Sequence, residues 1–121
     1  MKKIIAKSFY FEAAHKLSNT ENDENKNIHG HSYFVEIFII DQTNEINKSG
    51  LILDFSIFQK KLDLIKKDLD HKFLNDITEL GNPTLENIGL YIYKRLKKMD
   101  LHLHKILIKR KSCGETFILK V

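Results

Sequence analysis

The chain has 121 residues, of which 42% are hydrophobic and 30% are charged, and its net charge is +4. This length supports one hydrophobic core, and the composition is typical of a folded globular domain rather than a disordered chain. The modest charge and the absence of an interleaved aromatic and arginine pattern argue against a nucleic acid as partner, and no apolar stretch approaches the length of a membrane span.

The first half of the chain predicts two long β-strands, residues 3–15 and 28–41, separated by a polar loop at 18–27. In both strands apolar residues recur at every second position, which is the period of a strand. Both faces of 28–41 are apolar, so we expect both to be covered. The helices would cover one face, and a partner subunit would cover the other, for instance by closure into a β-barrel. The alternative is one very hydrophobic central strand in a monomer.

Two helices are predicted next. After a turn at 47–50, apolar residues recur at helical spacing between Phe55 and Leu69, where Ser56 and Gln59 would form a capping box. A second helix begins near 82–84, where a proline is flanked by capping residues.

The chain ends in a predicted hairpin of strands 102–110 and 115–121, turning at Cys113 and Gly114. The element order is therefore β-β-α-α-β-β. We expect a single α+β domain over 1–121, with a four-stranded antiparallel sheet and both helices on one face.

Three histidines predict a metal site. His29 and His31 share one strand face, with Cα atoms roughly 6.6 Å apart, and His15 ends the preceding strand. Three histidines with an open fourth position form the ligand set of a catalytic zinc ion. The alternative is a pair of half-exposed strand histidines without a metal. His102 and His104 repeat the spacing, but no third ligand lies near them in the sequence, so we interpret them as surface residues.

A second candidate is the pair Asp70 and His71 at the end of the first helix. At a helix end the chain can fold so that the carboxylate orients the imidazole, which then serves as a general base near neutral pH. The alternative is a solvated helix terminus.

The only cysteine, Cys113, excludes an internal disulfide and is typical of a reducing compartment. We interpret it as incidental, at the tip of the hairpin. The apolar run that follows Lys3 is interrupted at Lys7, so no signal peptide is predicted, and we expect a cytoplasmic protein with no membrane partner.

Five motifs occur together in the chain: FEAAH at 11–15, HGHSY at 29–33, ILDF at 52–55, LDHKFLND at 69–76 and NPTLEN at 82–87. Their order and separations resemble those of the 6-pyruvoyl-tetrahydropterin synthase family. In length and motif wording the chain is most similar to the bacterial 6-carboxytetrahydropterin synthase branch, and the resemblance covers nearly the whole chain.

The resemblance implies the tunnelling fold, in which trimers close a β-barrel and stack in pairs into homo-hexamers, with active sites at subunit boundaries. It implies Zn²⁺ as cofactor, bound by His15, His29 and His31. It also implies 7,8-dihydroneopterin triphosphate as the small-molecule substrate and a 6-carboxy product used in deazaguanine (queuosine) synthesis. By the same resemblance Asp70 and His71 work in proton transfer, and Thr84 and Glu86 meet the pterin ring.

The sequence departs from the family at the catalytic cysteine. The family commonly places this residue four positions before the HGH motif, where this chain has Asn25. A neutral amide cannot replace a thiolate. One branch of the family uses a glutamate in this loop and cleaves the side chain by a retro-aldol reaction. Glu24 is the nearest candidate for that role, in competition with Glu21 and Asp23.

A second departure concerns recognition of the pterin. Relatives carry a glutamate in the third strand that pairs with the pterin nitrogens, and the aligned position here is Arg110 or Lys111. A cation only donates hydrogen bonds. We place Arg110 among the substrate-binding residues, with Glu86 or Glu115 as the acid that substitutes.

Three functions follow as hypotheses. The first is a zinc-dependent lyase of the 6-carboxytetrahydropterin synthase type. The second is a cysteine-less family member with altered chemistry, either a pterin side-chain lyase or a 6-pyruvoyl-tetrahydropterin synthase-like enzyme with another substrate. The third is a non-catalytic zinc-containing binding protein.

Overall fold

Five strands form one sheet in the spatial order β3-β1-β2-β4-β5, in a computed structural model that describes residues 1–18, 21, 23–42 and 49–121. β3 pairs with β1 in parallel, and the other neighbouring strands are antiparallel. The sequence predicted four strands. The fifth, β3, has two residues, too few for any alternation to show. The strands are β1 (Ile4–His15), β2 (His29–Ile40), β3 (Lys72–Phe73), β4 (Leu103–Arg110) and β5 (Glu115–Lys120).

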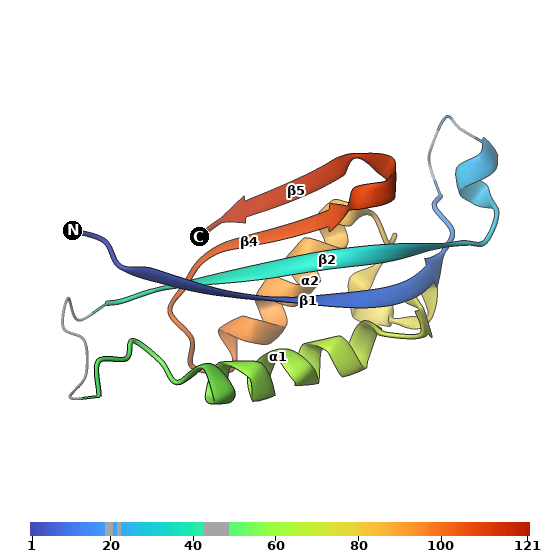
Figure 1. Cartoon of the computed structure of the whole chain (residues 1–121). Coiled ribbons are helices and arrows are strands. Elements are labelled where there is room, and N and C mark those ends of the chain that lie inside the picture. The colour runs from blue at the N-terminus through green and yellow to red at the C-terminus, as the bar shows by residue number, and fades with distance from the viewer. Residues whose placement is uncertain (19–20, 22, 43–48) are drawn as a thin grey trace.

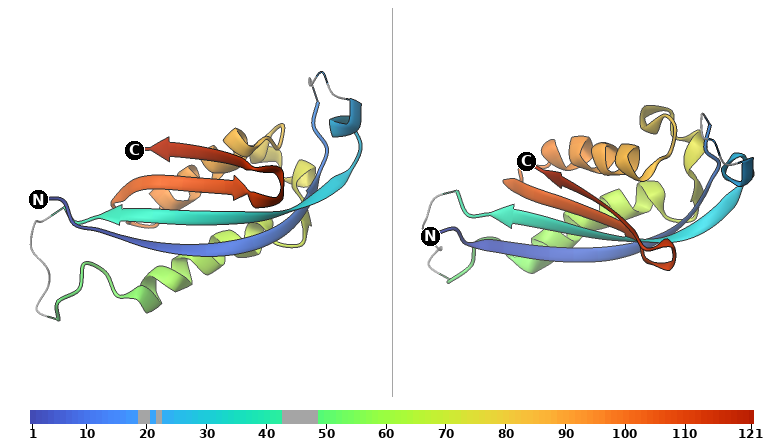
Figure 2. Two further views of the ribbon diagram at one scale, coloured as in Figure 1. Left: turned by 45° about the horizontal axis from the view of Figure 1, so that its top comes forward. Right: turned by 90° about the horizontal axis from the view of Figure 1, so that it is seen from above.

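Two helices, α1 (Phe55–Leu69) and α2 (Leu85–Lys97), cover one face of this sheet (Figure 1, and from above in Figure 2). The predicted α+β class, element order and helix placement are therefore confirmed. Short 3-10 turns join the elements: η1 (Asp23–Lys26), η2 (Leu74–Asp76), η3 (Thr78–Leu80) and η4 (Lys111–Cys113). Of the turn predicted at 47–50, positions 47 and 48 lie outside the described residues. Within the described ranges, no helix is long and apolar enough to cross a membrane.

The core lies between the sheet and the two helices. Phe11 of β1 and Tyr33 of β2 stack there, with ring centroids 4.6 Å apart. The helix α2 approaches the sheet closely at Gly89, where a Cβ atom would lie 2.6 Å from the ring of Phe117 on β5. Any larger side chain at this position would force the Phe117 ring to move, so glycine permits the close approach of α2 to β5.

The helix starts differ in part from the prediction. Asp54, not Ser56, caps α1, since its carboxylate accepts a hydrogen bond from the Ser56 backbone N–H at 2.7 Å. Gln59 donates to Asp63 instead of closing a capping box. At α2 the predicted capping is confirmed, because the Thr84 hydroxyl accepts from the backbone N–H of Asn87.

The longest strands, β1 and β2, extend at one end toward η1 (Figure 1). The tip of the β4–β5 hairpin points to the same end in Figure 1. This end of the sheet carries the three histidines of the predicted metal site.

Candidate functional site

The paired ends of β1 and β2 bring three histidines together. His15 lies opposite His29 in the antiparallel register, and His31 lies opposite Ala13. All three occupy the sheet face that carries the core, since they share the odd parity of the buried strand residues. One ring nitrogen from each histidine lies within 4.8 Å of the others, and the Nε2 atoms of His15 and His29 are 2.9 Å apart. The predicted cluster therefore forms.

Hydrogen bonds orient two of these rings. The Nδ1 of His15 lies 2.9 Å from the carbonyl oxygen of Pro83, and the Nδ1 of His29 lies 2.8 Å from the carbonyl oxygen of Asn27. A carbonyl accepts only from a protonated Nδ1, which leaves Nε2 as a lone-pair donor. The Nε2 of His31 is buried and has no hydrogen-bond partner. Such an orphaned nitrogen, beside two aligned ones, fits a site that holds a divalent metal ion.

Burial favours the neutral form of His15 and His31, as metal binding requires. Removal from water lowers the pKa of His15 to about 4, although the hydrogen bond to Pro83 opposes this shift. The pKa of His31 is also lowered, by burial first and by the nearby Arg110 cation second. Burial likewise raises the pKa of the neighbouring Tyr33 to about 12, so this phenol stays protonated.

The lowered pKa of His15 predicts a pH-dependent stability of the metal-free protein. The unfolded chain takes up a proton near pH 6.5, whereas the folded chain resists it down to about pH 4. The free energy of unfolding should therefore fall by roughly 3 kcal/mol as pH drops through this window, and it should be fully recovered above it. Urea titrations of the metal-free protein at several pH values would measure this slope. The slope should shrink in His15→Asn and persist in the surface variant His102→Asn. An unchanged slope in His15→Asn would contradict the assignment.

A pocket of about 320 Å³ opens beside the cluster. Glu24 and Asn25 of η1 line it together with the ligand candidates His29 and His31. The structure thus brings the loop carboxylate predicted from the sequence to the histidines. Its remaining lining residues are Leu17, Arg110, Cys113 and Glu115.

At the end of β4, the side chain of Arg110 lines this pocket and the side chain of Lys111 does not. Arg110 points to the histidine face, where its side chain is only 11% exposed and pairs with Glu115 of β5 at 3.2 Å. The Arg110 Nε is buried without a hydrogen-bond partner. Lys111 instead lies over Phe34 and donates to the hydroxyl of Tyr10. Of the two aligned positions, Arg110 is therefore the one that faces the site.

Cys113 is a site residue that the sequence did not predict. Its Sγ lies 3.8 Å from the Nδ1 of His31, which is 82 positions away along the chain. Only the pairing of β4 with β2 and the folding of η4 create this contact. The HGH motif and the lone cysteine carry no sequence signal that links them.

Two asparagines explain how the chain that leaves β1 is held near the cluster. Asn75 exchanges two hydrogen bonds with the backbone of Lys16, and Asn82 exchanges two with the backbone of Ser18. Each side-chain amide thus pairs with a backbone N–H and a backbone carbonyl, as a neighbouring strand would. Because these bonds fix the segment that follows His15, the motifs at 69–76 and 82–87 have a structural role in addition to any chemical one.

Asp70 and His71 form the expected pair. His71 has a left-handed backbone with a φ of 57°, which turns the chain out of α1 and lets the side chains of adjacent residues meet. The Nε2 of His71 lies 3.6 Å from the Asp70 carboxylate. The other oxygen of Asp70 accepts from the backbone N–H of Glu12, so this carboxylate also anchors the turn to β1.

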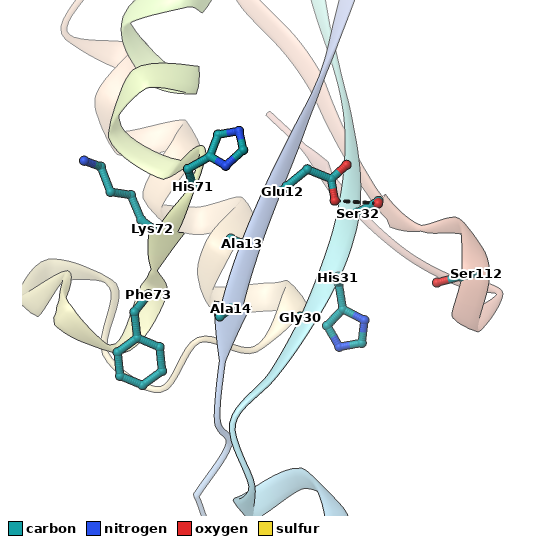
Figure 3. Close-up of a pocket in the computed structure, with 10 residues that line it drawn as sticks. All are labelled: Glu12, Ala13, Ala14, Gly30, His31, Ser32, His71, Lys72, Phe73 and Ser112. Carbon is teal, nitrogen blue, oxygen red and sulfur yellow. Dashed lines mark hydrogen bonds between the residues drawn. The ribbon is translucent and has the colours of Figure 1, made fainter.

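Asp70 and His71 do not belong to the three-histidine cluster of their own chain. His71 and His31 both line a pocket of about 650 Å³, together with Glu12 and Ser32. Figure 3 shows the segment of His71 on one side of β1, and His31 on β2 on the other side. Since Lys72, β1 and β2 are successive in the sheet, roughly 10 Å separates the backbones of Lys72 and His31.

The two residues expected to meet a pterin ring begin α2. The Thr84 hydroxyl serves as the cap, and Glu86 is exposed in the first turn. Their segment adjoins the cluster, because the preceding residue, Pro83, supplies the carbonyl that holds His15.

The fold and the site define an α+β protein with a candidate three-histidine metal centre and an adjoining pocket. A family model described as 6-pyruvoyl tetrahydropterin synthase matches residues 4–117. The chain belongs to the 6-pyruvoyl tetrahydropterin synthase family.

Individual relatives agree with this assignment. The chain is 37% identical over 107 residues to a 6-carboxy-5,6,7,8-tetrahydropterin synthase of Synechocystis, covering 85% of this chain and 82% of the relative. It is 39% identical over 98 residues to a dihydroneopterin monophosphate aldolase of Pyrococcus furiosus, covering 81% of this chain and 78% of the relative. A solved structure of the Caenorhabditis elegans 6-pyruvoyl tetrahydropterin synthase matches with a TM-score of 0.82 at 24% identity, covering 100% of this chain and 96% of the other.

Proposed function

We propose that this protein is a zinc-dependent lyase that acts on 7,8-dihydroneopterin triphosphate, with the activity of a 6-carboxytetrahydropterin synthase. The observation that carries the proposal is the cluster of His15, His29 and His31 beside a pocket with a loop carboxylate, in a chain of this family. The 6-carboxy product would then serve deazaguanine synthesis.

Zinc is the metal we propose, because three neutral imidazoles with no carboxylate among them suit this borderline-soft ion. Bound there, zinc would supply Lewis acidity that polarises side-chain oxygens of the substrate and acidifies the adjacent carbon-bound proton. The protein contributes the orientation of the rings and the burial that keeps His15 neutral.

Two groups are proposed to move protons. Glu24 lines the pocket beside the cluster, where it would accept a proton from the substrate side chain in place of the missing loop thiol. Asp70 would hold the His71 imidazole in position for a second transfer. The side chain of His71 is 81% exposed and its segment lies two strands from His31 in the sheet, so we propose that it completes the site of a neighbouring subunit.

Pterin recognition would involve both ends of the hairpin turn. Arg110 holds Glu115 at 3.2 Å, and both line the pocket. We propose that Glu115 accepts hydrogen bonds from the pterin nitrogens while Arg110 donates to an acceptor atom of the substrate. Thr84 and Glu86 would contact the ring from the start of α2.

A second candidate function is retro-aldol cleavage of the pterin side chain. Two observations favour it: the relative named as a dihydroneopterin monophosphate aldolase, and the presence of Glu24 in a loop without a thiol. Both functions use the same site and cleave the bond between the first and second carbons of the side chain. They differ in whether triphosphate is eliminated and in the oxidation state of the carbon that stays on the pterin.

Product analysis distinguishes these functions. The zinc-loaded protein would be incubated with 7,8-dihydroneopterin triphosphate or with the monophosphate, and the products would be identified by mass. A 6-carboxypterin product with release of triphosphate and acetaldehyde supports the first function, and a 6-hydroxymethyl product supports the second. Binding of either substrate without turnover would contradict both and indicate a zinc-containing binding protein.

Replacement of Glu24 by glutamine should lower turnover about 10²–10⁴-fold, because the amide cannot take up a proton. Zinc content should not change, since Glu24 lies outside the histidine cluster. Turnover at saturating zinc would measure the effect. Glu21→Gln, in the same loop, is the matched control. If Glu21→Gln is impaired and Glu24→Gln is not, the base is misassigned.

We also propose a homo-oligomer, with a hexamer built as a dimer of trimers. The sheet face opposite the helices carries a row of apolar side chains, and the outer side of the edge strand β5 pairs with no other described strand. The large apolar residues on this face are Ile4, Tyr10, Phe34, Phe38, Ile40, Leu107 and Ile118.

A lysine on the open face should break this assembly. Ile118, 47% exposed on β5, tolerates a lysine in a single protomer but would bury the charge in an interface. We expect wild-type protein of at least trimeric mass by light scattering, and a smaller mass for Ile118→Lys. Leu64→Lys, at a residue 53% exposed on α1, should keep the wild-type mass. A monomeric wild-type protein at micromolar concentration would contradict the proposal.

A further inference from the structure

The three histidines of the cluster differ in what holds their outer nitrogen. His15 and His29 each place Nδ1 within 2.9 Å of a backbone carbonyl oxygen. The Nδ1 of His31 instead faces the Sγ of Cys113 at 3.8 Å, within the range of a hydrogen bond to sulfur. The buried Nε2 of the same ring has no partner. Cys113 thus occupies, for His31, the place that a carbonyl occupies for the other two rings.

Metal binding fixes the direction of this hydrogen bond. If Nε2 of His31 donates its lone pair to an ion, the proton of the neutral ring must reside on Nδ1. That N–H then needs an acceptor, and the sulfur of Cys113 is the one the structure places beside it. Outer partners of this kind hold ligating rings in place and raise their basicity.

The backbone around Cys113 is arranged to present this side chain. Cys113 ends η4, and Gly114 follows with a φ of 67°, a left-handed conformation that glycine adopts without strain. The pairing of Arg110 with Glu115 closes the hairpin on the other side. The turn therefore directs residue 113 toward β2.

We propose that Cys113 is a positioning residue of the metal centre, which accepts a hydrogen bond from His31 Nδ1–H and thereby fixes the ring whose Nε2 binds the ion. This inference rests on the proposed metal site. It gives the sole cysteine of the chain a role distinct from that of a catalytic thiol, since it acts through His31.

Binding of Co²⁺ to the metal-free protein tests the inference without using turnover. Titration followed by the visible d–d absorption of cobalt would give the affinity. Cys113→Ala should bind Co²⁺ about 10–100-fold more weakly than wild type, the loss typical of an outer partner. Ser112→Ala, the adjacent position in η4, is the matched control and should bind as wild type does.

Two spectroscopic signatures separate positioning from other roles. A sulfur ligand would give a near-ultraviolet thiolate-to-cobalt charge-transfer band, which we expect to be absent from wild type. In ¹H–¹⁵N spectra of the zinc-loaded protein, the Nδ1–H resonance of His31 should shift in Cys113→Ala, while those of His15 and His29 stay in place. General destabilisation of the hairpin would not move one ring selectively.

Each outcome supports or overturns the proposed role of Cys113. Weaker binding with a selective shift of His31 supports the inference. A charge-transfer band that Cys113→Ala abolishes would overturn it in favour of direct ligation, and equal affinities would overturn it outright. If wild type binds neither Co²⁺ nor Zn²⁺, the proposed metal site fails and the inference falls with it. If wild type and Cys113→Ala bind Co²⁺ with equal affinity, the inference is rejected and the proposed metal site stands.

Discussion

Replacement of His31 by alanine should reduce bound zinc from about one ion per chain to background. The variant keeps two ligands, His15 and His29, which cannot close a three-nitrogen site. The loss of affinity should exceed the roughly 10–100-fold that removal of an outer partner costs. Elemental analysis after dialysis against a metal buffer would measure the zinc content, and the same samples would report turnover.

The sequence itself offers a matched control for this experiment. His102 and His104 repeat the spacing of His29 and His31, but neither belongs to the histidine cluster. His104→Ala should therefore keep wild-type zinc content. Stoichiometric zinc in His31→Ala, or equal losses in both variants, would contradict the proposed ligand set.

Replacement of His71 by alanine should lower turnover about 10²–10⁴-fold, the usual cost of a lost general base. Zinc content should stay at the wild-type level, because His71 is not one of the three clustered histidines. The conservative variant His71→Gln should be equally inactive, since a neutral amide cannot exchange a proton near neutral pH.

Mixed oligomers test whether His71 serves a neighbouring subunit. His71→Ala and His31→Ala are each expected to be inactive alone. Coexpressed in one oligomer, they should regain activity, because roughly one subunit boundary in four then joins an intact cluster to an intact His71. Mixtures that stay inactive although both chains are present in the same particles would place both groups in the site of one chain.

Much of this protein was predictable because the relevant information is local in the sequence. The period of two in 3–15 and 28–41 sets the histidines on the face of the buried residues, and the helical spacing from Phe55 to Leu69 defines α1. The cluster of His15, His29 and His31 followed from strand parity together with an antiparallel pairing of sequential strands.

Other features depended on contacts between distant parts of the chain. The cap of α1 fell on Asp54 and not Ser56, because both are capping residue types and only the backbone conformation distinguishes them. The strand β3 exists because the positive φ of His71 returns the chain to β1. Neither the cap of α1 nor the strand β3 could be predicted from hydrophobic periodicity.

The candidate site likewise has features that the sequence predicts and features that only the tertiary structure determines. The residue types in the histidine motifs determined which groups can bind a metal ion. The tertiary structure alone decided that Arg110, and not Lys111, faces them, and that Cys113 contacts His31. It also decided that the segment of His71 lies two strands from His31 in the sheet, with both side chains lining one pocket. The physical reason is that local spacing fixes the face on which a side chain lies, whereas register and turn conformation fix which distant side chain it meets.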